Sequence, residues 1–276
     1  MFHRAVAAAC TVAWLLAGAP SQAAPAAELW ERWTAHDARS DARIEHETWG
    51  GFLRRYVHVD PYGANRVDYG GVAAADRLAL KDYVRRLGEI PISRHSRPEQ
   101  LAYWINLYNA LTVDVVLDHY PVGSIRDIDI SPGFFSDGPW GKKLVTIEGE
   151  PVSLDDIEHR ILRPIWQDPR IHYAVNCASI GCPDLQPEPF TAGTADAMLT
   201  AAAQGYVNDP RGVLVADGRA SASSIYDWFQ ADFGGGEDGV LAHLRRYADD
   251  GLRERLEGIA SIGRYRYDWS LNDVSR

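Results

Sequence analysis

The spacing of apolar residues predicts one long, largely buried helix near the middle of the chain. In the stretch EQLAYWINLYNALTVDVVLDHY, residues 99–120, apolar side chains recur every three or four positions and cover a wide face. Pro98 stands at the start of this stretch and Pro121 just past its end, as is typical of helix boundaries. The same periodicity predicts shorter helices over residues 47–57, 73–87, 154–163, 197–207, 223–233 and 239–248.

Two hairpins and three short strands complete the predicted elements. The hairpins turn at a Glu-Gly and an Asp-Gly pair, and Asp-Gly favours a tight two-residue loop. They cover residues 144–153 and 212–221, and single strands are expected over residues 65–69, 171–176 and 262–269. Because helices and hairpins mix without a regular strand–helix alternation, the pattern favours the α+β class. We expect a single domain of mixed helices packed on a small antiparallel sheet.

The N-terminal residues resemble an export signal. Arg4 precedes an apolar run over residues 5–19, and Ser21-Gln22-Ala23 fits the small-x-small pattern that signal peptidase reads. The run is shorter than the roughly 20 residues that span a bilayer. We therefore expect a signal peptide over residues 1–23, and a periplasmic or secreted protein with no membrane span after cleavage. A loosely ordered lead over residues 24–44 and one domain over residues 45–276 would follow.

Composition and charge narrow the classes of partner. The chain is 46% hydrophobic and 24% charged, which is typical of a globular protein. Its formal net charge of -10 disfavours binding to nucleic acid or anionic lipid through a general field. No run of Lys and Arg interleaved with aromatic residues makes a local exception. A small-molecule or peptide ligand is compatible with this charge, and protein partners are not predicted.

Cysteine chemistry concentrates in the stretch IHYAVNCASIGCP. Cys177 and Cys182 are the two cysteines left after signal cleavage, and a close pair in an oxidising compartment favours a disulfide. The alternative is a catalytic thiolate at Cys177. A zinc site is less favoured because the spacing of five does not match the usual metal hook. Five residues of strand span roughly 16 Å, so His172 would not reach Cys177, and His159 is a candidate base.

Polar residues on apolar helix faces are the other candidates. Asn106 and Asn109 share a face of the long helix, and a buried amide without partners costs about 1–3 kcal/mol. They form either a structural network or a polar floor under a cleft. Glu158 lies on an apolar stripe and is expected to point inward, toward a histidine or arginine of another element. In the same helix, Ser153 is the predicted N-cap and Pro164 the predicted end.

Five ordered motifs carry a resemblance to a known family. They are EQLAYWINLYNALT, SLDDIEHRILR, IHYAVNCASIGCPDL, SIYDWFQADF and YRYDWSLN. Together they resemble the family catalogued as domain of unknown function 547, over roughly residues 47–272. The resemblance implies a secreted bacterial version of a domain that also occurs in larger eukaryotic proteins. It implies no settled activity.

A fainter similarity is to the papain and transglutaminase superfamily. It consists of a buried helix followed by a predicted strand that opens His172-Tyr173-Ala174. In that superfamily the helix presents the nucleophilic cysteine and the strand the histidine. Here the helix offers Trp104 and the two asparagines, with no cysteine. The similarity implies that His172 and Asn106 mark the cleft, and that Cys177 is a new nucleophile or part of a structural bridge.

Two classes of function remain open. The first is a cysteine- or histidine-dependent hydrolase or transferase acting on a peptide-like or small thiol substrate. Cys177 would be the nucleophile, His159 or His172 the base, and Asn106 or Glu158 the group that orients the base or binds a developing oxyanion. In this hypothesis the substrate is bound by Asn109, Trp104 and Ser179.

The second class is a non-enzymatic binding module of the cell envelope. It would have a structural polar core, a Cys177–Cys182 disulfide and a recognition surface at Phe134, Phe135 and Trp140. A metal-dependent enzyme is less favoured, because no pair of histidines has the spacing of a helical metal hook. We expect neither a metal nor another cofactor.

Overall fold

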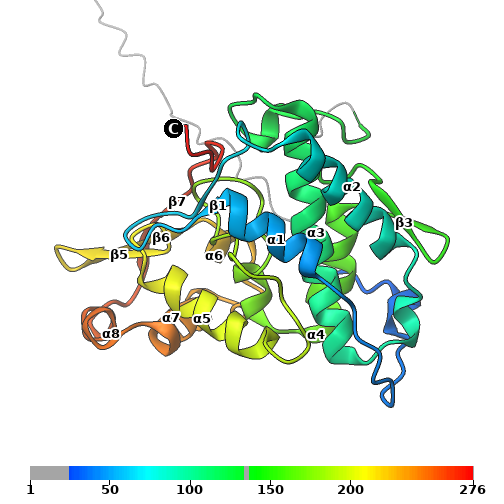
Figure 1. The fold of residues 1–276 in the computed structure, drawn as a ribbon. Helices are drawn as coiled ribbons and strands as arrows, with labels where there is room; N and C mark the ends of the chain where they lie inside the picture. Colours follow the sequence, from blue (N-terminus) through cyan, green and yellow to red (C-terminus); the bar gives the residue numbers. More distant parts are fainter. Residues whose placement is uncertain (1–24, 134–136, 276) are drawn as a thin grey trace, which may run out of the picture.

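Helix α3 (Arg97–His119) runs through the larger part of the molecule, and other helices cover its sides (Figure 1). The computed structural model describes residues 25–133 and 137–275, so the predicted signal peptide and the aromatic pair Phe134-Phe135 lie outside the described residues. Every side chain of α3 from Ala102 to Val113 is buried. This confirms the long buried helix. The flanking helices include α1 (Glu47–Tyr56) and α2 (Ala74–Gly88).

The strands form three small sheets, and the α+β class is confirmed. Two hairpins have the predicted turns, with positive φ at Glu148, Gly149, Asp217 and Gly218. β3 (Val145–Ile147) pairs antiparallel with β4 (Glu150–Val152), and β5 (Val213–Ala216) pairs antiparallel with β6 (Arg219–Ser223). β7 (Ile262–Arg266) joins β6 in parallel, which makes the third sheet mixed. The remaining pair is β1 (Val57–His58) with β2 (Arg66–Val67).

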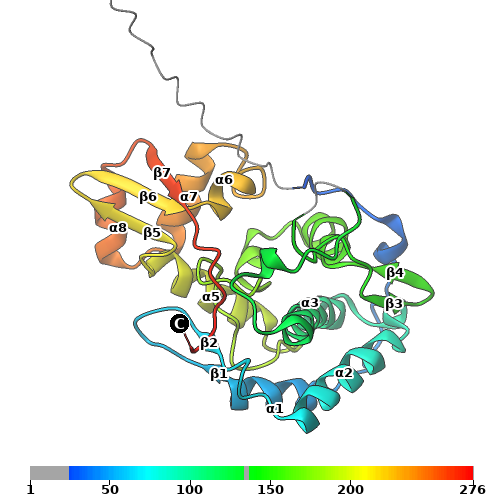
Figure 2. The same cartoon turned by 90° about the horizontal axis from the view of Figure 1, so that it is seen from above.

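The buried apolar side chains of the described residues form two clusters, and helix α5 contributes to both. The first surrounds α3, and the second lies among β5–β7, α7 (Glu237–Tyr247) and α8 (Asp250–Glu257). Helix α5 (Ala195–Asn208) contributes Leu199 to the first cluster and Tyr206 to the second. Figure 2 shows the C-terminal segment crossing from β7 to the neighbourhood of β2. We call the boundary between the two clusters the seam.

The helix that carries Glu158 is wound as a π-helix over Asp156–Leu162 and continues as α4 (Arg163–Trp166). Its predicted cap is confirmed, because the Asp156 backbone N–H donates to the Ser153 hydroxyl at 3.2 Å and the Ser153 N–H donates back to the Asp156 carboxylate at 2.8 Å. The prediction that Pro164 ends the helix is wrong. The helix passes through Pro164 and ends where Gln167 adopts a left-handed φ of 49°.

The N-terminal lead is more firmly packed than its composition suggests. The backbone N–H groups of Glu28 and Trp30 donate to the carbonyls of His159 and Arg160, each at 3.0 Å. These carbonyls lie one turn before Pro164, which has no N–H to offer them. A short 3-10 helix, η1 (Glu31–Thr34), then buries Trp33. The expectation of a loosely ordered lead over residues 24–44 does not fit this packing.

The predicted strand over residues 171–176 is wrong. Residues Pro169–Tyr173 form a 3-10 helix, η5, whose N-cap Asp168 accepts a hydrogen bond from the Arg170 backbone N–H. Asp followed by Pro is a helix-start signal. Short helices complete the described fold: η2 (Ile92–Arg94), η3 (Ile125–Asp127) and α6 (Ile225–Trp228).

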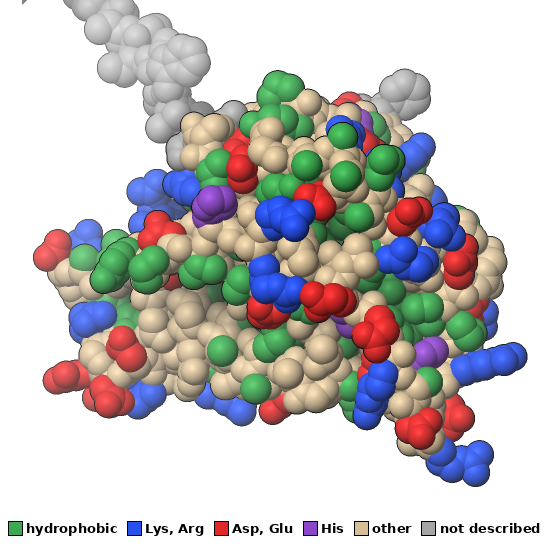
Figure 3. Space-filling view, in the orientation of Figure 1, with side chains coloured by type: hydrophobic (Ala, Val, Ile, Leu, Met, Phe, Trp, Pro, Cys, Tyr) green, Lys and Arg blue, Asp and Glu red, His purple; other side chains and the backbone are tan. Residues whose placement is uncertain are grey.

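The visible surface is mixed in charge. Figure 3 shows positive and negative side chains interspersed over one face. Among the described residues, no helix is both long and apolar enough to cross a bilayer.

Candidate functional site

A buried group of charged side chains lies at the seam between the two clusters. His172 of η5 is 2.7 Å from Asp232 through its Nε2 atom and 3.6 Å from Glu158 through its Nδ1 atom. Its ring stacks on Phe229, with the centroids 4.2 Å apart. The Tyr108 hydroxyl of α3 donates to Glu158 at 3.1 Å. Carboxylates from both sides of the seam therefore bracket one imidazole.

Arg163 and His159 extend this group along the π-helix. Arg163 Nε donates to Asp232 at 2.6 Å, and its NH1 group lies 3.0 Å from His159 Nδ1. NH1 also donates to the carbonyl of Pro25 at 2.7 Å, which ties the lead to the group. Because guanidinium only donates, His159 accepts through Nδ1. We call these five residues the ion cluster: Glu158, His159, Arg163, His172 and Asp232.

The electrostatics of the ion cluster favour ionised carboxylates. Burial opposes ionisation of Glu158, but His159, His172 and Arg163 outweigh it and lower its pKa to about 2. Burial works against the charged form of His172, yet its hydrogen bonds to Asp232 and Glu158 raise its pKa above the ordinary value. Burial lowers the pKa of His159 to about 4, so this ring is neutral at pH 7. The contacts of His172 with the two carboxylates therefore favour the charged form of its ring.

The outer edge of the ion cluster borders a hollow of about 520 Å³. Arg163 and Asp232 lie on its wall, where the Arg163 side chain is 5% exposed and the Asp232 side chain is 21% exposed. Among the described residues, no group of three or more His, Cys, Asp and Glu side chains is arranged to hold a metal ion.

The thiol pair lies in the loop that follows η5, and two asparagines shape this loop. Asn109 of α3 donates to the carbonyl of Ala174 and accepts from the backbone N–H of Asn176, each at 2.8 Å. Asn176 in turn donates to the carbonyl of Pro183 at 2.8 Å and accepts from the Ala178 N–H at 2.9 Å. Both arms of the loop are thus held together.

The two sulfurs face each other inside this loop. Cys177 Sγ and Cys182 Sγ are 3.1 Å apart, and the Cys177 backbone N–H donates to Cys182 Sγ at 3.1 Å. The Ser179 and Tyr267 hydroxyls lie 3.2 and 3.0 Å from Cys177 Sγ. A disulfide requires about 2.05 Å. The predicted disulfide is therefore not formed in this structure, where both cysteines are free.

The two thiols have opposite acidities. The hydrogen bond with Cys182 lowers the pKa of the Cys177 thiol, and those with Ser179 and Tyr267 add to this effect against the opposing effect of burial. Burial raises the pKa of Cys182 well above its ordinary value. Cys177 is partly exposed, whereas Cys182 is buried. Cys177 is thus the more acidic and more accessible thiol of the pair.

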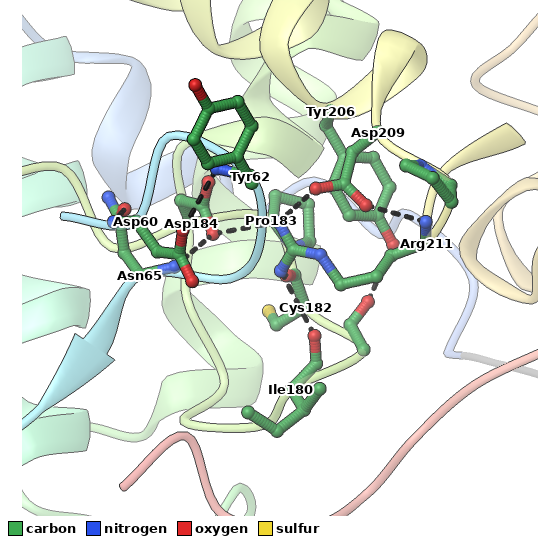
Figure 4. A network of polar contacts seen from close by, with 12 residues as sticks. Asp60, Tyr62, Asn65, Ile180, Cys182, Pro183, Asp184, Tyr206, Asp209 and Arg211 are labelled. Atoms are coloured by element: carbon green, nitrogen blue, oxygen red, sulfur yellow. Dashed lines mark hydrogen bonds and ion pairs between the residues drawn. The ribbon is translucent and has the colours of Figure 1, made fainter. Parts of the chain in front are cut away.

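The loop is also closed from outside by two separate segments. Arg211 donates through NH1 to the carbonyls of Ile180 and Cys182, at 3.1 and 3.2 Å, and pairs with Asp184 and Asp209 through NH2 (Figure 4). The C-terminal segment lies along the other side, where the Gly181 N–H donates to the carbonyl of Asp268 at 2.8 Å. A Cβ at Gly181 would lie 2.6 Å from the Asp268 nitrogen. The loop is therefore rigidly positioned.

The structure separates the predicted site residues into three groups. Cys177, Cys182 and Ser179 meet at the thiol pair. Glu158, His159 and His172 meet in the ion cluster, where the inward orientation expected of Glu158 is confirmed. Among the described residues, no histidine hydrogen-bonds to either sulfur.

The third group consists of residues held by local structure. Asn106 clasps the backbone of Phe190, donating to its carbonyl at 2.7 Å and accepting from its N–H at 3.0 Å. Asn109 holds the thiol loop, as described above. Trp104 is 1% exposed and packs edge-to-face on Trp33, so it offers no surface to a substrate.

Three contributors were not singled out from the sequence. Asp232 and Tyr267 belong to the motifs SIYDWFQADF and YRYDWSLN. These motifs identified the two segments, but they did not single out these two side chains as site residues. Arg211 lies outside every motif. Their partners are distant in sequence, by 60 residues for Asp232 and His172 and by 90 for Tyr267 and Cys177. No local pattern signals such a contact.

The comparisons with known proteins identify a family and nothing finer. Residues 92–207 match the family model described as "Protein of unknown function, DUF547". The match is shorter than the span of the five motifs and stops before the last two, SIYDWFQADF and YRYDWSLN. No curated protein and no solved structure matches the chain. The papain-like similarity thus stays a prediction.

Proposed function

We propose that this chain, whose residues 92–207 match the family described as protein of unknown function, DUF547, carries out thiol–disulfide exchange at Cys177 and Cys182. One observation carries the proposal: two free sulfurs 3.1 Å apart in unequal surroundings. Exchange needs an accessible thiolate that attacks and a second thiol that resolves. The acidic, partly exposed Cys177 suits the first role, and the buried Cys182 suits the second.

The reaction conserves atoms and electrons. The Cys177 thiolate attacks one sulfur of a substrate disulfide, the substrate S–S bond breaks, and the leaving thiolate takes up a proton. Cys182 then loses its proton and attacks Cys177 Sγ, which forms the Cys177–Cys182 disulfide and releases the second substrate thiol. The protein dithiol is oxidised and the substrate disulfide is reduced. A movement of about 1 Å closes the gap between the sulfurs.

The surroundings of the sulfur favour exchange over hydrolysis. Acyl transfer by a cysteine normally uses a histidine within hydrogen-bonding reach. The hydrogen-bond partners of the Cys177 sulfur are instead a thiol and two hydroxyls, while His159 and His172 are engaged in the ion cluster. Hydroxyl and thiol donors stabilise a thiolate without a base.

Export through residues 1–23 is part of the proposal. An oxidising compartment outside the cytoplasm contains the disulfides on which such a dithiol acts. The test is whether the N-terminal residues direct a reporter protein across the inner membrane. Retention of the reporter in the cytoplasm would exclude this location and leave the chemistry to the next experiment.

The chemistry is tested with the reduced protein and a peptide disulfide. The wild-type protein is expected to reduce the peptide and to lose two hydrogens by intact mass. Cys182→Ser is expected to accumulate a mixed disulfide, because nothing resolves it. Cys177→Ser should do neither. Urea unfolding of both variants checks that they fold.

Two results would overturn the proposal. The first is a Cys177→Ser variant that reduces the peptide as fast as the wild type. The second is a Cys177–Cys182 disulfide that resists excess dithiol reductant in the folded protein. The latter result would favour the structural bridge of a binding module, a role with which the backbone clasps of Asn106 and Asn109 agree.

A further inference from the structure

An aromatic wall stands beside the thiol pair, and we infer that it binds an apolar side chain of a peptide substrate next to its disulfide. The wall consists of Trp140, Trp228, Tyr267 and Trp269, all partly buried. The inference rests on the proposed function, because it names the substrate class that the thiol pair would act on.

Tyr267 joins the wall to the reacting sulfur. Its hydroxyl lies 3.0 Å from Cys177 Sγ, and its ring is 4.8 Å from Trp228 and 4.6 Å from Trp269, centroid to centroid. Trp228 and Trp269 also stack on each other at 5.6 Å. A residue that flanks a disulfide bound at Cys177 would therefore come within reach of these rings.

The wall spans the seam. Trp140 and Trp269 pack against the first apolar cluster, whereas Trp228 and Tyr267 pack against the second. Ligand sites occur preferentially at such boundaries, and partly exposed aromatic groups beside a reactive atom are more informative than scattered apolar residues. The wall thus has the position of a substrate subsite.

The rings are held by their surroundings before any ligand arrives. The carbonyl of Trp140 accepts from the Asp155 N–H at 3.0 Å. Gly138 has a φ of 71°, and a Cβ there would lie 2.1 Å from the Trp140 ring, so the turn needs glycine to seat this ring. Trp140 meets Trp269 edge-to-face at 5.9 Å. A rigid aromatic surface loses little entropy when it binds a side chain.

Charge near the wall argues for an uncharged occupant. Arg126 lies over Trp269, with its guanidinium carbon 5.4 Å from the ring centroid, but it is paired with Asp137. This pair leaves no net charge to select an acidic or basic residue. Aliphatic or aromatic side chains gain the most from contact with such a surface.

The test compares two cystine peptides that differ in one flanking residue, leucine or serine. The wild-type protein is expected to prefer the leucine peptide by about tenfold in kcat/KM, as burial of one apolar side chain allows. Trp228→Ala should reduce this preference to about twofold. Trp166→Ala, a partly buried tryptophan on α4, is the matched control and should keep the full preference.

Binding without turnover separates this inference from the proposed function. The Cys177→Ser variant cannot react at that position, so its affinity for the two peptides, measured calorimetrically, reports on the wall alone. Tighter binding of the leucine peptide, lost on Trp228→Ala, would support the wall even if no exchange occurs. Equal affinity for both peptides, or an unchanged preference in Trp228→Ala, would overturn the inference.

Discussion

The two hydrogen bonds from Asn109 to the backbone of the thiol loop allow a quantitative prediction. Asn109 is 3% exposed, and its amide satisfies the carbonyl of Ala174 and the N–H of Asn176, which are themselves buried. Asn109→Ala removes both partners at once. An unsatisfied buried backbone group costs about 1–3 kcal/mol, so two such groups lower the free energy of unfolding by about 4 kcal/mol. This is a large part of the roughly 5–15 kcal/mol of a natural domain.

Urea unfolding followed by tryptophan fluorescence measures this loss. With a slope of about 3 kcal/mol per molar urea, the midpoint is expected to fall by about 1.3 M without a change in slope. A loss below about 1 kcal/mol would refute the argument, since a single unsatisfied group already costs that much.

Asn106→Ala provides the matched control. Asn106 lies on the same helix and also makes two hydrogen bonds, but it clasps Phe190 instead of the thiol loop. It should cost a similar free energy of unfolding, yet leave the pH profile of Cys177 alkylation unchanged. Asn109→Ala should shift that profile, because the loop that holds the two sulfurs together is released. Identical profiles for the two variants would show that the clasp does not tune the thiol.

Three further predictions concern stability. Burial lowers the pKa of His46 to about 4, so the contribution of this residue to the free energy of unfolding is complete above its unfolded pKa of about 6.5 and is lost as the pH falls toward 4. His46→Gln should therefore reduce the slope of the unfolding free energy against pH by up to about 1.4 kcal/mol per pH unit, and an unchanged slope would contradict this. Asp232→Asn breaks the ion cluster and should lower the free energy of unfolding in urea by about 3 kcal/mol. The control Asp196→Asn changes an 88% exposed side chain and should lower it by less than about 0.5 kcal/mol, and equal losses would argue against a buried cluster. Gly181→Ala should destabilise the fold by about 1–3 kcal/mol because the added Cβ meets the backbone of Asp268. Gly205→Ala adds a Cβ in open space on a helix and should stabilise the fold by about 0.5 kcal/mol. Thermal unfolding that reverses this order would refute the close approach of Gly181 to Asp268.

Local signals in the sequence were sufficient for the elements that end in clear caps and turns. The prolines around α3, the Ser153 cap and the Asp-Gly hairpin each act within a few residues, so their outcome depends little on distant packing. The strand predicted over residues 171–176 was wrong for the opposite reason. All six are buried, and a fully buried run shows no reliable alternation of faces. The Asp-Pro helix start just before them was the better signal.

The inward orientation of Glu158 was predictable, but its partners were not. Helical spacing placed its carboxylate on an apolar stripe, and burial of a charge required a histidine or arginine nearby. His172 and Tyr108 meet it from other elements. Likewise, the pairing of Cys177 with Tyr267 depends on how the C-terminal segment crosses the seam. A single sequence contains no local pattern for contacts of this range.

The ion cluster and the thiol pair interact electrostatically, so the charge of the ion cluster affects the pKa of Cys177. A nearby Glu158 carboxylate raises the pKa of Cys177 and so opposes its thiolate. In the ion cluster, however, Arg163 and His172 pair with Asp232 and Glu158, and the pKa of His172 is raised by these hydrogen bonds. Arg163 and His172 thus offset part of the negative charge that opposes a thiolate at Cys177.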